Sequence, residues 1–300
     1  MPAVGSPRAL LEGTLQGACV APRPPPEPTM PDPLIDLTIE SWETLIRTLD
    51  DLNGRMPDAW FRGQEDHAWR LRPSINRYLT DVPPQQAAEM ELNSLLRFMG
   101  EAHAHLPTTA LPRDPFGWDV LDNYVEWLAL MQHHGAPTRM LDWSCSPYVG
   151  LYFAVTGRPE TDAALWFFDH RAVSVALFDR LQLPVTSLID YRVMPSAVIA
   201  APSTTAPIIF PAMKKMRSAR EIAQQGVFTF CDHLQGDHQD ALASMSGGGF
   251  GRIRIPAALK RECALRLRSM NLTPAALFPG VDGVCQSIRQ EFEYARLVPM

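Results

Sequence analysis

The sequence has few cysteines and no long apolar run, and both deficits exclude classes of protein. Its five cysteines lie far apart, without a Cys-x-x-Cys pair or a histidine spacing of zinc type, so neither a disulfide framework nor a structural zinc site is indicated. No stretch approaches the roughly 18 consecutive apolar residues of a membrane-spanning helix. Glu12 and Gln16 interrupt the apolar residues near the start, where a signal-peptide core would lie. We therefore expect a cytoplasmic protein without membrane contacts.

Basic residues are outnumbered, which argues against broad binding to nucleic acid. The chain has 27 Lys and Arg against 33 Asp and Glu, a net charge of -6, so attraction to polyanions would need a local basic patch. Nine of its 28 prolines fall within residues 1–33, a composition that cannot fold alone. We expect a disordered Pro-rich tail over 1–33, either a start-site extension or a ligand for a partner domain, and one folded domain over 34–300.

Helical and strand-like patterns alternate irregularly after the tail. Apolar periodicity and capping residues predict helices over 41–53, 84–105, 121–134, 146–155, 218–225, 256–270, 273–278 and 281–292. Runs of β-branched and aromatic residues predict strands over 59–61, 163–169, 197–201, 208–210, 227–231 and 251–255. In the second helix, the expected apolar stripe is Leu92, Leu95, Leu96 and Met99. The irregular alternation favours an α+β domain over a doubly wound α/β domain.

Polar and small residues gather at the ends of these apolar elements, where binding groups are common. Four groups stand out: Phe61-Arg62-Gly63-Gln64, Gln132-His133-His134-Gly135, the run from Thr138-Arg139 through Asp142-Trp143-Ser144 to Ser146-Pro147, and Arg220 with Gln224-Gln225-Gly226.

Arg62 leaves an apolar strand and precedes Gly63, which tolerates close backbone approaches. Its planar guanidinium suits a phosphate or a carboxylate ligand. A buried ion pair with Glu65, Asp66 or Asp142 is the competing interpretation.

Two adjacent histidines end the helix over 121–134. His133 and His134 point about 100 degrees apart on a helix, so they cannot hold one metal together, and no metal site is expected. Either they cap the helix, or one imidazole titrates in a cleft beside the following turn. Thr138 and Arg139 follow that turn and could donate hydrogen bonds to a bound anion.

Asp142, Ser144 and Ser146 lie just before a helix start, where a ribose or phosphate could be held. Ser146 is equally well explained as an N-cap and Ser144 as a turn residue. Gln224 and Gln225 beside Gly226 could reach sugar hydroxyls, or they could simply end a helix. The basic residues before them are more typical of a solvated helix face.

Together these motifs resemble the FRG domain family. The resemblance spans about residues 40–290 and adds Trp69, Leu71, Pro73-Ser74, Arg77, Pro137, residues 151–154, Val227-Phe228-Thr229, Leu277-Phe278-Pro279 and Asp282-Gly283 to the four groups. The family takes its name from the Phe-Arg-Gly motif and is mostly bacterial and phage-associated. The motif order is also similar, more distantly, to that of the ADP-ribosyltransferase superfamily.

The distant resemblance implies a fold, a cofactor and a set of roles. The fold would be a single mixed α+β domain with helices on a small, mostly antiparallel split sheet, and the cofactor would be NAD. Arg62 would hold the NAD phosphates or ribose, Ser144 or Ser146 would support the nicotinamide ribose, and Gln225 or Gln224 would complete the site. Transferases usually offer a glutamate where this chain has Gln-Gln-Gly, so Glu221 or His134 would have to assist. The cofactor-binding candidates are Arg62, Gly63, His134, Thr138, Arg139, Ser144, Ser146, Gln224 and Gln225, and the catalytic candidates are Arg62, Ser144, Gln225, Glu221 and His134.

We therefore expect an NAD-binding protein that transfers ADP-ribose to a macromolecular acceptor, protein or nucleic acid, in a bacterial toxin or phage-defence setting. A neutralising or regulatory partner protein would fit that setting. The alternative is a non-catalytic module that binds a nucleotide or partner through Arg62, Arg139 and the histidines. A hydrolase built on His134, Asp142 and Glu221 is a third possibility.

Overall fold

The computed structural model describes residues 34–107, 111–112, 124–181, 206–214 and 217–296. All of these residues belong to one compact unit. The expected Pro-rich tail over 1–33 and the expected strand over 197–201 lie outside the described residues.

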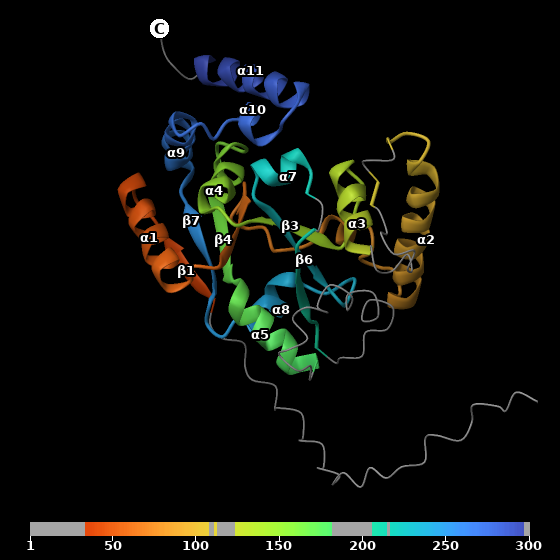
Figure 1. The fold of residues 1–300 in the computed structure, drawn as a ribbon. Coiled ribbons are helices and arrows are strands. Elements are labelled where there is room, and N and C mark those ends of the chain that lie inside the picture. Colours follow the sequence, from red (N-terminus) through yellow and green to blue (C-terminus); the bar gives the residue numbers. More distant parts are fainter. Residues whose placement is uncertain (1–33, 108–110, 113–123, 182–205, 215–216, 297–300) are drawn as a thin grey trace, which may run out of the picture. The chain divides into compact units, whose positions relative to one another are not determined.

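One mixed sheet runs through the described part of the chain (Figure 1). Its seven strands have the order β1-β7-β4-β2-β3-β6-β5. Their bounds are β1 Ile35–Thr38, β2 Ala59–Gln64, β3 Met140–Ser144, β4 Ala163–Asp169, β5 Ile209–Ala212, β6 Gly226–Cys231 and β7 Phe250–Ile255. β1 pairs with β7 in parallel, and the other neighbours are antiparallel. The predicted α+β class and mostly antiparallel sheet are thus confirmed, whereas the patterns missed β1 and β3.

The two halves of the sheet meet at one position. β2 pairs with β4 along its whole length and β3 pairs with β6 along its whole length, but β2 and β3 pair only at Phe61 and Ser144. The sheet is therefore single and larger than the small split sheet that we expected. Beyond the Phe61–Ser144 pair, the two central strands part, and the opening between them leads to the site described below.

Helices cover both faces of the sheet (Figure 1). One apolar core lies under α1 Trp42–Arg55, α4 Pro147–Val155, α9 Ala257–Ser269 and the short α10 Pro274–Leu277. The other lies under α2 Pro84–Ala102, α3 Tyr124–His133, α5 His170–Leu181 and α8 His238–Met245. Neighbouring residues of β4 alternate between the two cores, Phe167 facing the first and Trp166 and Phe168 the second. This double burial explains the continuous apolar run of the strand.

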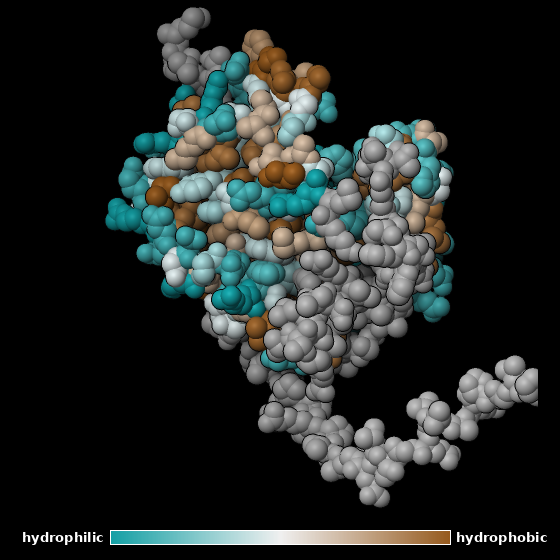
Figure 2. Space-filling model, in the orientation of Figure 1, coloured by the Kyte–Doolittle hydropathy of each residue, from teal (hydrophilic) through white to brown (hydrophobic). Residues whose placement is uncertain are grey.

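The remaining helices lie nearer the surface. They are a 3-10 turn Ser74–Arg77, α7 Ala219–Ala223 and the C-terminal α11 Val281–Arg296. Exposed apolar side chains gather on α11, and Figure 2 shows a hydrophobic surface over this helix. They are Val281, Val284, Ile288 and Phe292.

Local capping signals predicted helix starts well. Ser146 caps α4 by accepting a hydrogen bond from the Val149 amide, and Pro147 occupies its first turn. Ser41 caps α1 in the same way, although this helix continues past the expected stop at Asn53-Gly54 to Arg55.

The predicted stripe of α2 is half confirmed: Leu95 is buried and Met99 packs against the same core, whereas Leu92 and Leu96 face outward. Leu92 and Leu96 are 44% and 46% exposed, whereas Ala87, Glu91 and Leu95 are buried. This face packs through Ala87 and Leu95 against apolar clusters, and the Glu91 carboxylate on it is paired with Arg139. The patterns also missed α5 and α8.

Candidate functional site

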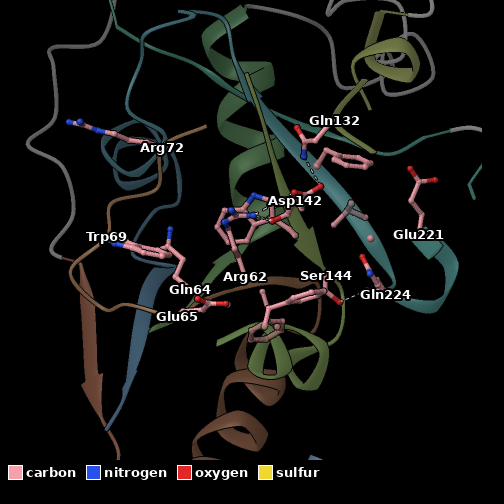
Figure 3. A pocket seen from close by; sticks show the side chains of 18 of the residues that line it. Arg62, Gln64, Glu65, Trp69, Arg72, Gln132, Asp142, Ser144, Glu221 and Gln224 are labelled. Atoms are coloured by element: carbon pink, nitrogen blue, oxygen red, sulfur yellow. Dashed lines mark hydrogen bonds and ion pairs between the residues drawn. The ribbon is translucent and has the colours of Figure 1, made fainter. Parts of the chain in front are cut away.

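A pocket of about 920 Å³ opens where β2 and β3 part. Its walls come from the end of β2, the loop after it, β3, the last turn of α3, and the α7–β6 turn. Figure 3 shows Arg62 at its centre, with Trp69 and Arg72 on one side and Ser144 and Gln224 on the other. A cavity of this size is in the range of sites for small molecules and cofactors.

The Phe-Arg-Gly motif lies at the base of the pocket, and each of its three residues makes a different contact. Phe61 is buried and pairs with Ser144 across the sheet. Gly63 lies against α4 so closely that an added Cβ would be 2.1 Å from the Gly150 carbonyl oxygen and 2.4 Å from the Ala154 nitrogen. Since residues of a strand alternate between faces, Arg62 points to the side opposite Phe61 and Gly63.

Arg62 bridges the opening between the two strands. Its Nη1 donates a hydrogen bond of 2.6 Å to the backbone oxygen of Asp142 and lies 3.9 Å from the Asp142 Oδ2. Burial lowers the pKa of Arg62, and the nearby Asp142 carboxylate opposes that shift. Its Nε is buried and meets no acceptor among the described residues. Arg62 thus contacts one of the three carboxylates considered above, and 23% of its side chain remains exposed at the pocket.

A short hydrogen-bonded chain holds Asp142 on the opposite wall. Gln132 donates from Nε2 to the Asp142 Oδ1 at 2.7 Å, and the hydroxyl of Thr138 donates to the Gln132 Oε1. Figure 3 shows the Gln132 amide directed at Asp142. Thr138 is fully buried. Thr138 therefore lies behind the pocket wall, and its hydroxyl supports Gln132 in place of binding an anion.

Arg139 serves the fold rather than the pocket. Its guanidinium is 2% exposed and pairs with Glu91, which is 5% exposed. Arg139 Nη1 also donates to the backbone oxygens of Cys231 and Asp232, both at 3.2 Å. Tyr124 donates its hydroxyl to Glu91 at 2.6 Å. Every part of the guanidinium is thus held inside the protein, so the structure places this anion-binding candidate away from the pocket.

The serines and glutamines divide between pocket and backbone roles. Ser144 lines the pocket and donates its hydroxyl to the Gln224 backbone oxygen at 2.8 Å. Gln224 also lines the pocket, and its Nε2 donates to the Leu277 oxygen at 3.0 Å. Ser146 is the N-cap of α4. Gln225 adopts a φ of 47° in the turn, and its backbone oxygen accepts from the Cys145 amide. Of each alternative pair, Ser144 and Gln224 are the pocket-lining members.

The two residues expected to assist catalysis are placed differently. Glu221 borders the pocket, but its carboxylate accepts from the Ser218 amide in a capping box and from Lys214 Nζ at 3.0 Å. In Figure 3 this carboxylate points away from Arg62. His133 lines the pocket, whereas the exposed His134 is not among its lining residues. Burial, followed by the charge of Arg220, lowers the pKa of His133.

Several arginines surround the opening, and the catalytic and cofactor-binding candidates predicted from the sequence did not include them, although Arg220 and Arg77 lie in the motifs noted above. They are Arg70, Arg72, Arg77 and Arg220. Arg70 is paired with Asp237 and Asp240, both at 2.7 Å. Trp69 adds an aromatic wall. Trp69 and Arg77 belong to the motif set quoted above, so a signal for them existed, whereas nothing local marked Gln132 as the support of Asp142.

Among the residues that the structure describes, no group of three or more His, Cys, Asp or Glu side chains could hold a metal ion. Within the same residues, no helix has the length and apolar character needed to cross a membrane.

Comparison with known proteins bears on the first part of the pocket. Residues 57–163 match the family model described as the FRG domain. No curated protein and no solved structure matches the chain. The matched range contains β2, β3 and α4, and with them Arg62, Gln132, Asp142 and Ser144. The resemblance that the motifs indicated is thus confirmed for this range, and the chain carries an FRG domain over residues 57–163.

Proposed function

We propose that the pocket binds NAD and that the chain is an ADP-ribosyltransferase-like protein acting on a macromolecular acceptor. The observation that carries the proposal is Arg62, which stands in the gap between β2 and β3, lines the pocket and keeps 23% of its side chain exposed. The exposed part of this side chain can donate to a bound phosphate in the charge-assisted geometry that arginine favours.

The composition of the walls supports a ligand with both anionic and aromatic parts. Arginines outnumber carboxylates around the opening, which favours phosphates. Trp69 and Phe153 add aromatic surface to the walls, and such surface suits the flat rings of a dinucleotide. The cavity volume of about 920 Å³ also suits a ligand larger than a mononucleotide.

In the proposed reaction, the bond between the nicotinamide nitrogen and the ribose C1′ breaks, and its electron pair leaves with nicotinamide. A nucleophile of the acceptor then bonds to C1′ and loses a proton to solvent. Ser144 and Gln224 border the space beside Arg62 and would face the ribose. The family resemblance suggests a bacterial toxin or phage-defence setting, in which a neutralising partner protein would have a place.

A second candidate function is nucleotide binding without turnover. It is favoured by Glu221, whose carboxylate is held by Lys214 and by the Ser218 amide. A carboxylate engaged in this way offers little negative charge to a cationic transition state.

The experiment that tests the proposal combines binding with transfer. Purified protein is titrated with NAD by calorimetry, and it is incubated with labelled NAD and bacterial lysate. We expect binding, release of nicotinamide and labelled macromolecules. Binding without consumption would favour the second candidate, and absence of binding at millimolar NAD would contradict the proposed function.

A further inference from the structure

The pocket contains a carboxylate to which the proposed function assigns no role. Asp142 is 63% exposed, although it stands on a central strand between buried neighbours, Leu141 and Trp143. Its side chain is on the same face of β3 as Ser144, because residues two apart on a strand share a face. It lies 3.9 Å from Arg62. The pocket thus presents a negative and a positive group side by side.

This carboxylate is held in one orientation by the chain of hydrogen bonds behind it. A glutamine amide has one donor end and one acceptor end. The hydroxyl of Thr138 occupies the acceptor end of Gln132, so the donor end faces Asp142 Oδ1 at 2.7 Å. The other oxygen, Oδ2, is the one that faces Arg62. The Asp142 carboxylate is therefore already ordered before a ligand binds, so binding need not restrict its motion further.

We propose that Asp142 recognises the positively charged nicotinamide end of NAD and stabilises the positive charge that develops on the ribose as the glycosidic bond breaks. This inference rests on the function proposed above. Arg62 and Asp142 then bind different parts of NAD: the guanidinium binds the phosphates, and the carboxylate binds the cationic nicotinamide end. Asp142 supplies the negative charge that a cationic transition state requires. Gln224 has no such charge, and the Glu221 carboxylate is paired with Lys214.

The location of the positive charge during the reaction agrees with this assignment. Before the bond breaks, the positive charge is on the nicotinamide ring. Afterwards nicotinamide is neutral and the charge is shared by C1′ and the ring oxygen of the ribose, until the acceptor adds its electron pair. The carboxylate favours both charged states and is unchanged at the end.

Gln132 acts in this scheme as a positioning residue. It lies in the last turn of α3 and also lines the pocket, but its assigned role is to fix the direction of Asp142. Removing the amide should therefore matter only while residue 142 is an aspartate.

The first test compares ligands of different charge by calorimetry. NAD⁺ carries the cationic ring, NADH lacks the ring charge, and ADP-ribose lacks the ring. Wild type should bind NAD⁺ more tightly than NADH, and Asp142→Asn should reduce that preference by about threefold, as expected for a half-exposed charge pair. ADP-ribose should bind Asp142→Asn at least as tightly as wild type. Asparagine keeps an oxygen for Gln132, so thermal unfolding should be unchanged.

Asp51→Asn is the matched control, because Asp51 is an exposed carboxylate of α1 outside the pocket. It should leave the NAD⁺ preference at the wild-type value. If Asp142→Asn does the same while wild type binds all three ligands, the role of Asp142 is overturned and the proposed function stands. If wild type binds none of them, both fall.

A second test separates positioning from direct contact. Gln132→Leu should lower the NAD⁺ preference in the wild-type background, and it should have no further effect in Asp142→Asn. Independent, additive effects of the two substitutions would contradict the assigned chain.

Discussion

Gly63 of β2 lies directly against Gly150 of α4, so that a Cβ on Gly63 would be 2.1 Å from the Gly150 carbonyl oxygen. The opposing atoms belong to a helix backbone and cannot move singly. The glycine therefore lets α4 rest on the strand that carries Arg62. Its role in the motif is close packing, and its effect on the site is to hold the arginine in place.

Replacing Gly63 with alanine should destabilise the protein. The added methyl group has no free volume, so the helix must move away from the sheet, at a cost of about 1–3 kcal/mol or more in the free energy of unfolding. Gly100→Ala in α2 is the control, because an added Cβ there meets no atom within 4 Å. That change should be neutral or stabilising by up to about 1 kcal/mol. Urea denaturation measures both, and equal effects would contradict the packing role.

Arg62→Ala should separate binding from folding. The side chain is partly exposed, with 23% of its surface accessible, and its direct hydrogen bond is to a backbone oxygen. We expect NAD or ADP-ribose binding to be lost by calorimetry, while the free energy of unfolding changes by about 1 kcal/mol or less. A loss of several kcal/mol in urea, with binding retained, would instead make Arg62 a structural support of β3.

Arg139→Ala should show the opposite behaviour. It leaves Glu91 buried without its partner, which costs about 3–5 kcal/mol in comparable buried pairs. The double variant Arg139→Met with Glu91→Leu removes both charges and should recover much of that loss. Chemical denaturation of the three proteins measures this recovery. If the double variant is as unstable as the single one, the pair is not the source of the stability.

The elements that the sequence predicted are those whose signals are local. Ser146 and Pro147 mark the start of α4 within a few residues, and the helix begins there. β3 was missed because Asp142 and Ser144 interrupt its apolar pattern, and the strand exists through its pairing with β6. The buried face of α2 was assigned only in part for a similar reason, since the buried position of Glu91 involves Arg139, which is 48 residues away.

The same distinction applies to the site. Arg62 and Ser144 belong to motifs, and the structure brings both to one pocket. The choice between Gln224 and Gln225 depends on the left-handed φ of 47° at Gln225, which turns that residue away from the lining. The link from Thr138 through Gln132 to Asp142 depends on how α3 meets β3. No local pattern could predict that contact.

His238 is a buried histidine close enough to Arg62 to be affected by its charge. Its imidazole is fully buried, and burial together with the positive charge of Arg62 lowers the pKa of His238 to about 3. Its Nδ1 lies 3.3 Å from the Thr229 hydroxyl, which also accepts a hydrogen bond from the Trp143 indole. The folded protein therefore requires the neutral ring at every pH above about 3.

This requirement predicts a loss of stability in mild acid. In the unfolded chain the pKa of a histidine is about 6.5, so between pH 6.5 and 3 the unfolded state binds the additional proton. The free energy of unfolding is thus not reduced by His238 above pH 6.5. Below that pH, protonation of His238 in the unfolded chain lowers it by at most about 1.4 kcal/mol per pH unit. In His238→Gln this term is absent, so its free energy of unfolding, measured in urea from pH 7 to 4, should fall less steeply than that of wild type. Parallel pH profiles for the two proteins would show that His238 is protonated in the folded state, and the low pKa and the influence of Arg62 on this ring would both have to be abandoned.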